Sequence, residues 1–151
     1  MTASIIGSGV KRKEDHRFIT GQGRYTDDIN RPGQAHAYFL RSPHAHAKIK
    51  SIDTAEARNA KGVVAIFTGK DIAADKIGGL ICGWMITSKD GSPMKAGAHP
   101  ALALDTVRYV GDHVAIVIAE TLAQARDAAE LINVDYAELP VVTEPAKAQS
   151  P

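Results

Sequence analysis

The chain has 151 residues, of which 44% are hydrophobic and 23% charged, with 18 basic and 17 acidic side chains. A formal net charge of +1 at pH 7 gives no electrostatic reason to expect nucleic acid or an acidic membrane surface as a partner. The single cysteine, Cys82, excludes a disulfide framework or a zinc ribbon built within this chain.

Residues 1–33 are predicted to form an extended arm. They carry little periodic hydrophobicity and much turn chemistry, in the strings GSG, TGQG and NRPG. Because such a segment buries little by itself, we expect it to lie against another surface. The N-terminus lacks the apolar core of a secretory signal, and no stretch approaches the ~20 apolar residues of a membrane span, so a cytoplasmic location is expected.

Two strands are expected at the start of the folded domain, which spans residues 34–148. The string AHAYFLRS, residues 35–42, predicts the first strand. After a turn at Pro43, residues 44–52 alternate in polarity, with alanine and isoleucine on one face. The opposite face of this second strand is expected to carry four basic or titratable side chains: His44, His46, Lys48 and Lys50.

A helix is predicted next, followed by a buried strand. Asp53 is expected to be the N-cap of the helix, with Glu56 in the position of a capping box and Gly62 at the end. The string VVAIFTG, residues 63–69, is apolar and β-branched, as is typical of a buried strand.

Residues 70–100 show no regular pattern. They combine an apolar patch around Trp84 with many Gly, Pro and Ser residues. A loop of this length in a compact domain is usually functional, disordered or covered by a partner. We therefore expect exposed apolar surface near Ile81, Trp84 and Met85, and self-association of the isolated chain.

The last third of the chain has the clearest pattern. The string HVAIVIA, residues 113–119, predicts a buried strand, and Thr121 is expected to cap the following helix with Gln124 in the capping-box position. The strings NVDY and ELPVV then complete the domain. One face of the helix is expected to carry Leu122, Ala125, Ala129 and Ile132.

A strand–helix–strand unit thus occurs twice, on either side of the irregular middle. Two such units predict an α+β fold with helices packed on a small mixed sheet. The right-handed crossover rule predicts parallel pairing within each unit, while the strand order stays open. An internal duplication also stays open, because short helices rich in alanine and arginine resemble one another easily.

The histidines are the first candidates for a metal site. His44 and His46 are expected on one strand face, and His36 lies shortly upstream. Lysines on the same face would oppose a cation, and transition-metal sites need three or four converging ligands. Asp27 and Asp28 could add carboxylates only through a tertiary contact, and turn chemistry explains them more simply. A half-exposed polar strand face is therefore the simpler interpretation.

The other motifs also lack the residues that an active site needs. The string GSGVKR, residues 7–12, lacks the third glycine and the preceding strand of a dinucleotide fingerprint. Cys82 lies in an apolar run, which favours an inert packed thiol over a nucleophile. His99 has no partner identifiable from the sequence, and Trp84 and Met85 are expected in a core or an interface. No catalytic, cofactor-binding or metal-binding residue is assigned.

Four blocks of sequence together carry a family resemblance. They are EDHRFITGQGRYTDDI, RSPHAHAKIKSIDTAEA, GVVAIFTGKDI and the run from HPALALDTVRYVGDHVAIVIAE to LAQARDAAELINVDYAELPVV. In this order they resemble the N-terminal α/β hammerhead domain of molybdenum hydroxylase large subunits. That family includes xanthine dehydrogenase, aldehyde oxidase and the aerobic carbon monoxide dehydrogenases. The resemblance runs from residue 11 to about residue 148, and residues 78–95 look most like the carbon-monoxide-dehydrogenase type of bacterial subunit.

The resemblance implies that the cofactors of the enzyme lie outside this chain. In the family, molybdopterin, the catalytic glutamate and the substrate pocket belong to the longer region that follows, and residues 149–151 would begin the linker to it. Iron–sulfur clusters and FAD belong to partner subunits or domains. The active-site cysteine of carbon monoxide dehydrogenases also lies beyond this segment, so Cys82 does not inherit its role. The chain alone is expected to be inactive, with no nucleic acid or membrane partner.

Three hypotheses of function remain. The first is a structural and assembly domain of a molybdenum hydroxylase, which packs against the molybdopterin-binding region. The second is a separately encoded interaction module that assembles in trans with a molybdopterin-binding subunit. The third is an independent metalloprotein that uses His36, His44 and His46.

Overall fold

The computed structural model describes residues 7, 9 and 11–149, which belong to two compact units divided after Gln34. The first part of the expected arm, with part of the GSG string, and the last two residues of the expected linker lie outside the described residues. Within the first unit, the described part contains a short helix α1 (Asp15–Ile19) and a 3-10 helix η1 (Thr26–Asp28), neither of which was predicted. The Phe18 and Tyr25 rings stack 5.6 Å apart between their centroids.

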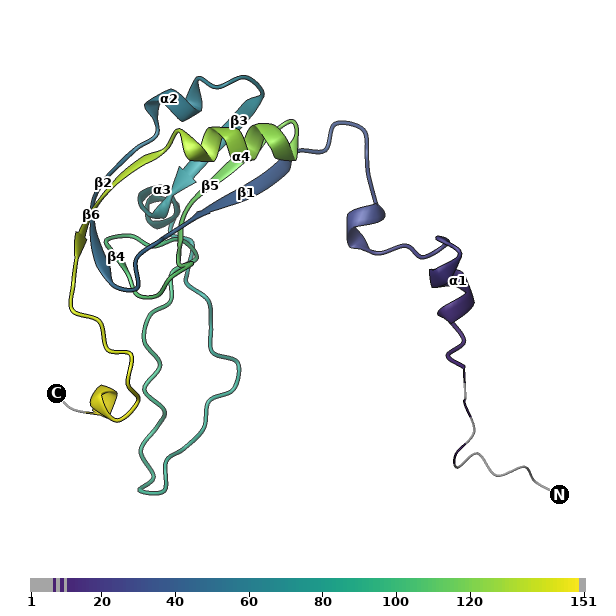
Figure 1. Ribbon diagram of the computed structural model, residues 1–151. Coiled ribbons are helices and arrows are strands. Elements are labelled where there is room, and N and C mark those ends of the chain that lie inside the picture. The colour runs from purple at the N-terminus through teal and green to yellow at the C-terminus, as the bar shows by residue number, and fades with distance from the viewer. Residues whose placement is uncertain (1–6, 8, 10, 150–151) are drawn as a thin grey trace. The chain divides into compact units, whose positions relative to one another are not determined.

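The second unit contains two antiparallel sheets of three strands each (Figure 1). One sheet has the order β1-β5-β3, formed by β1 (His36–Arg41), β5 (His113–Ala119) and β3 (Val63–Thr68). The other has the order β4-β2-β6, formed by β4 (Thr106–Val107), β2 (Ala47–Asp53) and β6 (Asn133–Glu138). The expected strands are thus present, and the predicted α+β class is confirmed.

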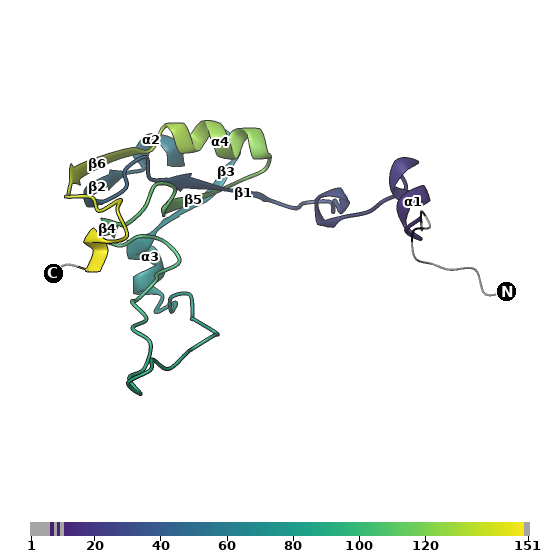
Figure 2. The same ribbon diagram turned by 60° about the horizontal axis from the view of Figure 1, so that its bottom comes forward.

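The main core lies between the first sheet and helix α4 (Leu122–Glu130), which packs on β1 and β5 (Figures 1 and 2). The helix buries small side chains, Ala125, Ala128 and Ala129, so its backbone can approach the sheet closely. Ile66 and Val117 fill the sheet side of this core, and full burial of such a side chain stabilises the fold by about 1.5–3 kcal/mol. A smaller cluster contains residues of both sheets, Ala47 and Val107 from the second and Val114 from the first, together with Ala103.

The predicted parallel pairing within each strand–helix–strand unit is wrong. Every pairing among the named strands is antiparallel, because each helix carries the chain from one sheet to the other. β2 and β3, on either side of α2 (Ala55–Arg58), belong to different sheets, and so do β5 and β6 on either side of α4. The crossover rule applies only when both strands join the same sheet.

The two predicted helix starts are present, with different caps. The Thr121 hydroxyl accepts a hydrogen bond from the Gln124 N–H at 3.2 Å, as predicted. At α2 the N-cap position belongs to Thr54, while the Asp53 carboxylate accepts a hydrogen bond from the Ala55 N–H at 2.9 Å. α2 is a single turn that ends at its C-cap, Asn59, before the expected end at Gly62.

A further helix, α3 (Gly69–Ala74), was not predicted. The Asp71 carboxylate accepts hydrogen bonds from the Thr68 N–H and hydroxyl, both at 2.7 Å, which caps this helix. The hydrogen bonds from Thr68 lower the pKa of Asp71 from its ordinary value. The sequence signal was present as Thr-x-x-Asp, but the helix is too short to show an apolar periodicity.

Residues 77–99 form a long two-limbed loop between α3 and β4, which we call the excursion (Figure 2). Its limbs join at the base, where the Leu80 N–H donates to the His99 carbonyl oxygen at 2.7 Å. Near the tip, Thr87 and Pro93 form an isolated β-bridge. Among the described residues, no helix has the length and apolar character needed to cross a membrane.

Candidate functional site

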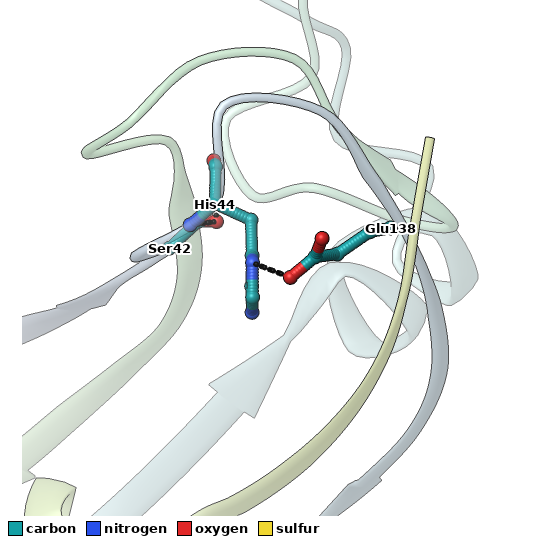
Figure 3. A network of polar contacts seen from close by, with 3 residues as sticks. All are labelled: Ser42, His44 and Glu138. Atoms are coloured by element: carbon teal, nitrogen blue, oxygen red, sulfur yellow. Dashed lines mark hydrogen bonds and ion pairs between the residues drawn. The ribbon is translucent and has the colours of Figure 1, made fainter. Parts of the chain in front are cut away.

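The two histidines of the RSPHAHA string precede β2 and do not share a strand face. The His44 ring contacts the Tyr136 ring at 4.8 Å between centroids, and its Nδ1 lies 3.4 Å from Glu138 Oε1 (Figure 3). The His46 Nδ1 lies 2.8 Å from the Pro140 carbonyl oxygen. Because a carbonyl oxygen only accepts, Nδ1 of His46 carries the proton of this hydrogen bond. The predicted common face is therefore wrong, because the strand begins only at Ala47.

A buried serine holds the turn that carries His44. The Ser42 side chain is 2% exposed, and its Oγ accepts a hydrogen bond from the His44 N–H at 3.0 Å. The Ser42 backbone N–H donates to the Asp112 carbonyl oxygen at 2.8 Å, which ties this turn to the loop before β5. Burial raises the pKa of Tyr136, and a hydrogen bond with Ser42 opposes that rise. This cluster joins three segments that are distant in the sequence.

The third histidine lies away from the other two along β1. His36 pairs with Ala119 at one end of the strand, and Arg41 pairs with His113 at the other. At about 3.3 Å per residue, the strand places His36 roughly 16 Å from Arg41, the end from which the chain continues to His44. In the described part of the chain, no group of three or more His, Cys, Asp or Glu side chains could hold a metal ion.

The acidic pair of the first unit lies in the 3-10 helix. The Asp28 carboxylate accepts a hydrogen bond from the Tyr25 N–H at 2.8 Å. The prediction that this pair accepts backbone hydrogen bonds in a turn is therefore confirmed for Asp28.

The prediction of a packed thiol at Cys82 is wrong, since this residue is exposed. It lies on the excursion, where its Sγ is 3.7 Å from the Trp84 carbonyl oxygen. Its apolar neighbours are also exposed, with 92% of Ile81, 82% of Trp84 and 56% of Met85 accessible. The predicted exposure of apolar side chains near these residues is confirmed, and Trp84 and Met85 belong to no core among the described residues.

A cavity of about 500 Å³ lies at the base of the excursion. A smaller one of about 200 Å³ shares part of its wall, including His99 and Arg108. The His99 Nε2 lies 3.4 Å from the Tyr109 hydroxyl, a partner that the sequence did not reveal. Partial burial and the nearby Asp112 carboxylate raise the pKa of Tyr109. The wall of the larger cavity is mainly apolar and includes Leu80, Ile81, Pro100 and Leu104.

A family model described as "Aldehyde oxidase and xanthine dehydrogenase, a/b hammerhead domain" matches residues 20–140. The chain is 42% identical over 147 residues to the nicotine 6-hydroxylase large subunit of Paenarthrobacter nicotinovorans, covering 97% of this chain and 17% of that protein. It is 40% identical over 149 residues to the carbon monoxide dehydrogenase large chain of Afipia carboxidovorans, with coverages of 97% and 17%. The expected likeness to subunits of the carbon-monoxide-dehydrogenase type is thereby confirmed.

Solved structures show the same likeness. Quinoline 2-oxidoreductase from Pseudomonas putida 86 matches with a TM-score of 0.83 and 41% identity, covering 95% of this chain and 18% of that one. The Cu,Mo-CO dehydrogenase matches with a TM-score of 0.76 and 39% identity, covering 96% of this chain and 17% of that one. The chain therefore spans less than a fifth of the length of these relatives.

Proposed function

Because the chain belongs to the aldehyde oxidase and xanthine dehydrogenase α/β hammerhead family, we propose that it is a structural and assembly domain of a molybdenum hydroxylase large subunit. The observation that supports this role is the extent of the match, which takes in nearly the whole chain but only 17% of each of the two relatives named above. We call the part of such a subunit that this chain does not match the remainder.

The cofactors of the whole enzyme are assigned to other parts of the assembly. Molybdopterin belongs to the remainder, and iron–sulfur clusters and FAD belong to partner subunits or domains. The molybdenum cofactor supplies oxidative hydroxylation, with water as the source of oxygen. Among the described residues, no three His, Cys, Asp or Glu side chains converge, so they do not fit a metal ion. No step of the hydroxylation is therefore assigned to this chain.

The role of the chain is to pack against the remainder and to help it assemble. The second unit has a packed core of its own around Ile66 and Val117, so it can act as a rigid body. The exposed apolar side chains of the excursion can form an interface with another part of the enzyme. An assembly domain requires both a packed core of its own and exposed apolar side chains that can form an interface.

The test compares the remainder produced with and without this chain. We expect the remainder alone to yield less soluble enzyme with stoichiometric molybdenum, and addition of the chain, in the same polypeptide or as a separate one, to restore it. Equal molybdenum content and equal turnover without the chain would refute the assembly role. Turnover or stoichiometric molybdenum in the purified chain alone would refute the placement of the active site.

The same experiment separates the second hypothesis from the first. If the chain and the remainder form a stable complex when they are produced as two polypeptides, the chain can act in trans as an interaction module. If only the continuous polypeptide yields active enzyme, the domain acts in cis.

A further inference from the structure

The excursion presents an uncharged apolar limb to its surroundings. From Ile77 to Ser88 the sequence has no charged residue. Large apolar side chains that stay exposed in a row mark interaction sites in proteins. The large apolar side chains that this limb exposes are Ile77, Leu80, Ile81, Trp84, Met85 and Ile86.

The tip of the excursion has the opposite character. It carries Lys89 and Asp90, and Lys95 follows on the returning limb. The Asp90 carboxylate accepts hydrogen bonds from the Ser92 hydroxyl at 2.7 Å and from the Ser92 N–H at 2.9 Å. These bonds lower the pKa of Asp90, so the turn keeps its charge in water. Because the limb is apolar and the turn is charged, the limb can be buried against another protein surface while the turn stays in solvent.

The base of the excursion is tightly held. A Cβ atom at Gly79 would lie 2.5 Å from the His99 carbonyl oxygen, so only glycine allows the two limbs to approach this closely. The limbs are joined again near the tip, where the Met94 N–H donates to the Ile86 carbonyl oxygen at 3.1 Å. The excursion is thus a defined structure at both ends, although its apolar side chains lack a core.

The matched enzymes indicate what surrounds this structure. The part of this chain that quinoline 2-oxidoreductase leaves unmatched, 5%, is shorter than the excursion. The match therefore extends into the excursion, in a protein where this domain makes up 18% of the chain. The rest of that same chain, more than four times the length of the matched part, is available to cover an apolar limb there.

We propose that the apolar limb of the excursion docks in an apolar groove of the remainder, with the tip around Asp90 left in solvent. This inference rests on the proposed function, since it names the surface through which the domain assembles. The occupant is the remainder, in preference to lipid or a second copy of this chain.

Cys82 provides the test, because it is the single cysteine of the chain and lies on the apolar limb. Its alkylation by N-ethylmaleimide is followed by mass spectrometry of the Cys82 peptide, in the dilute isolated chain and in the assembled large subunit. We expect the rate to fall at least about tenfold on assembly, because a covered thiol reacts only after local opening. The control is Ser92→Cys at the tip, which should react at similar rates in both states.

The outcomes distinguish this inference from the proposed function. Assembly with Cys82 still fully reactive would overturn the docking of the limb and leave the assembly role standing. Failure of the chain to assemble at all would overturn both. Protection that disappears on dilution of the assembled subunit, and not only of the isolated chain, would assign the surface to a second copy and overturn the proposal.

A pair of variants checks the same surface without a thiol. Trp84→Ser should reduce the affinity for a separately produced remainder at least about tenfold, the scale expected when an interface tryptophan is truncated. Val64→Ser removes another exposed apolar side chain, on β3, and should leave assembly unchanged. Equal effects of the two variants would overturn the assignment of the interface to the excursion.

Discussion

Replacing Gly79 with alanine should loosen the base of the excursion without unfolding the domain. The added Cβ would lie 2.5 Å from the His99 carbonyl oxygen and 3.0 Å from its carbon. Both are backbone atoms, so the limbs must separate and the hydrogen bond from the Leu80 N–H, 2.7 Å long, must weaken. The lost bond costs about 0.5–1.5 kcal/mol and the overpacking about 1–3 kcal/mol. Reduced freedom of the unfolded chain offsets about 0.4–1 kcal/mol of this.

The net cost is therefore about 2 kcal/mol, which corresponds to roughly thirtyfold more frequent opening of the base. Hydrogen exchange of the Leu80 amide, followed by NMR, measures this opening directly. The melting temperature of the domain should change little, because the base lies outside the core around Ile66 and Val117.

The neighbouring glycine provides a matched control. A Cβ at Gly78 would meet nothing within 4 Å, so Gly78→Ala should leave the exchange rate of Leu80 within about twofold. Equal exchange rates in the two alanine variants would refute the view that close backbone approach at Gly79 holds the limbs together.

Three further predictions follow from other parts of the structure. Asp71→Ala removes the cap of α3 and should lower the free energy of unfolding by about 1 kcal/mol at pH 7. The hydrogen bonds from Thr68 hold the folded-state pKa of Asp71 below its ordinary value of 3.8, so its contribution is complete above pH 3.8 and is lost as the pH falls through the lowered value. Denaturant titrations in which the difference between wild type and variant does not shrink at acid pH would contradict this. The isolated chain should self-associate at high concentration in sedimentation analysis, and Trp84→Ser should weaken this; a clean monomer at every concentration would count against it. Zinc titration should show no stoichiometric binding, and His46→Ala should not change the result, because no three possible ligands converge among the described residues. Stoichiometric zinc that is lost in that variant would revive the metalloprotein hypothesis.

The elements predicted correctly are those whose signals are local. β5 is a run of seven residues that are apolar except for His113, and α4 begins after an N-cap residue, Thr121, whose side chain accepts a hydrogen bond from the Gln124 N–H. Both elements can therefore be predicted from neighbouring residues alone. α3 was missed because six residues are too few to show a helical period, even though Thr68 and Asp71 carry its capping pattern.

The placement of His44 and His46 on a strand face was wrong for a different reason. The alternation of residues 44–52 is real, but the strand begins only at Ala47, where β2 starts to pair with β6 and β4. His44 contacts Glu138 and His46 is hydrogen-bonded to Pro140, and these contacts between residues far apart in the sequence cannot be predicted from a local pattern. Cys82 was misplaced because apolar neighbours normally indicate burial, whereas here they lie on a loop outside the core.

Neither sheet of the second unit is made from a continuous stretch of chain, and this has a consequence for synthesis. β1 and β3 both pair with β5, so neither has its sheet partner until residue 119 has left the ribosome. β2 pairs with β4 over two residues only and gains its longer partner, β6, at the end of the domain. The growing chain therefore exposes its unpaired strands and the excursion together until β5 emerges, and the second sheet gains its longer partner only when β6 follows.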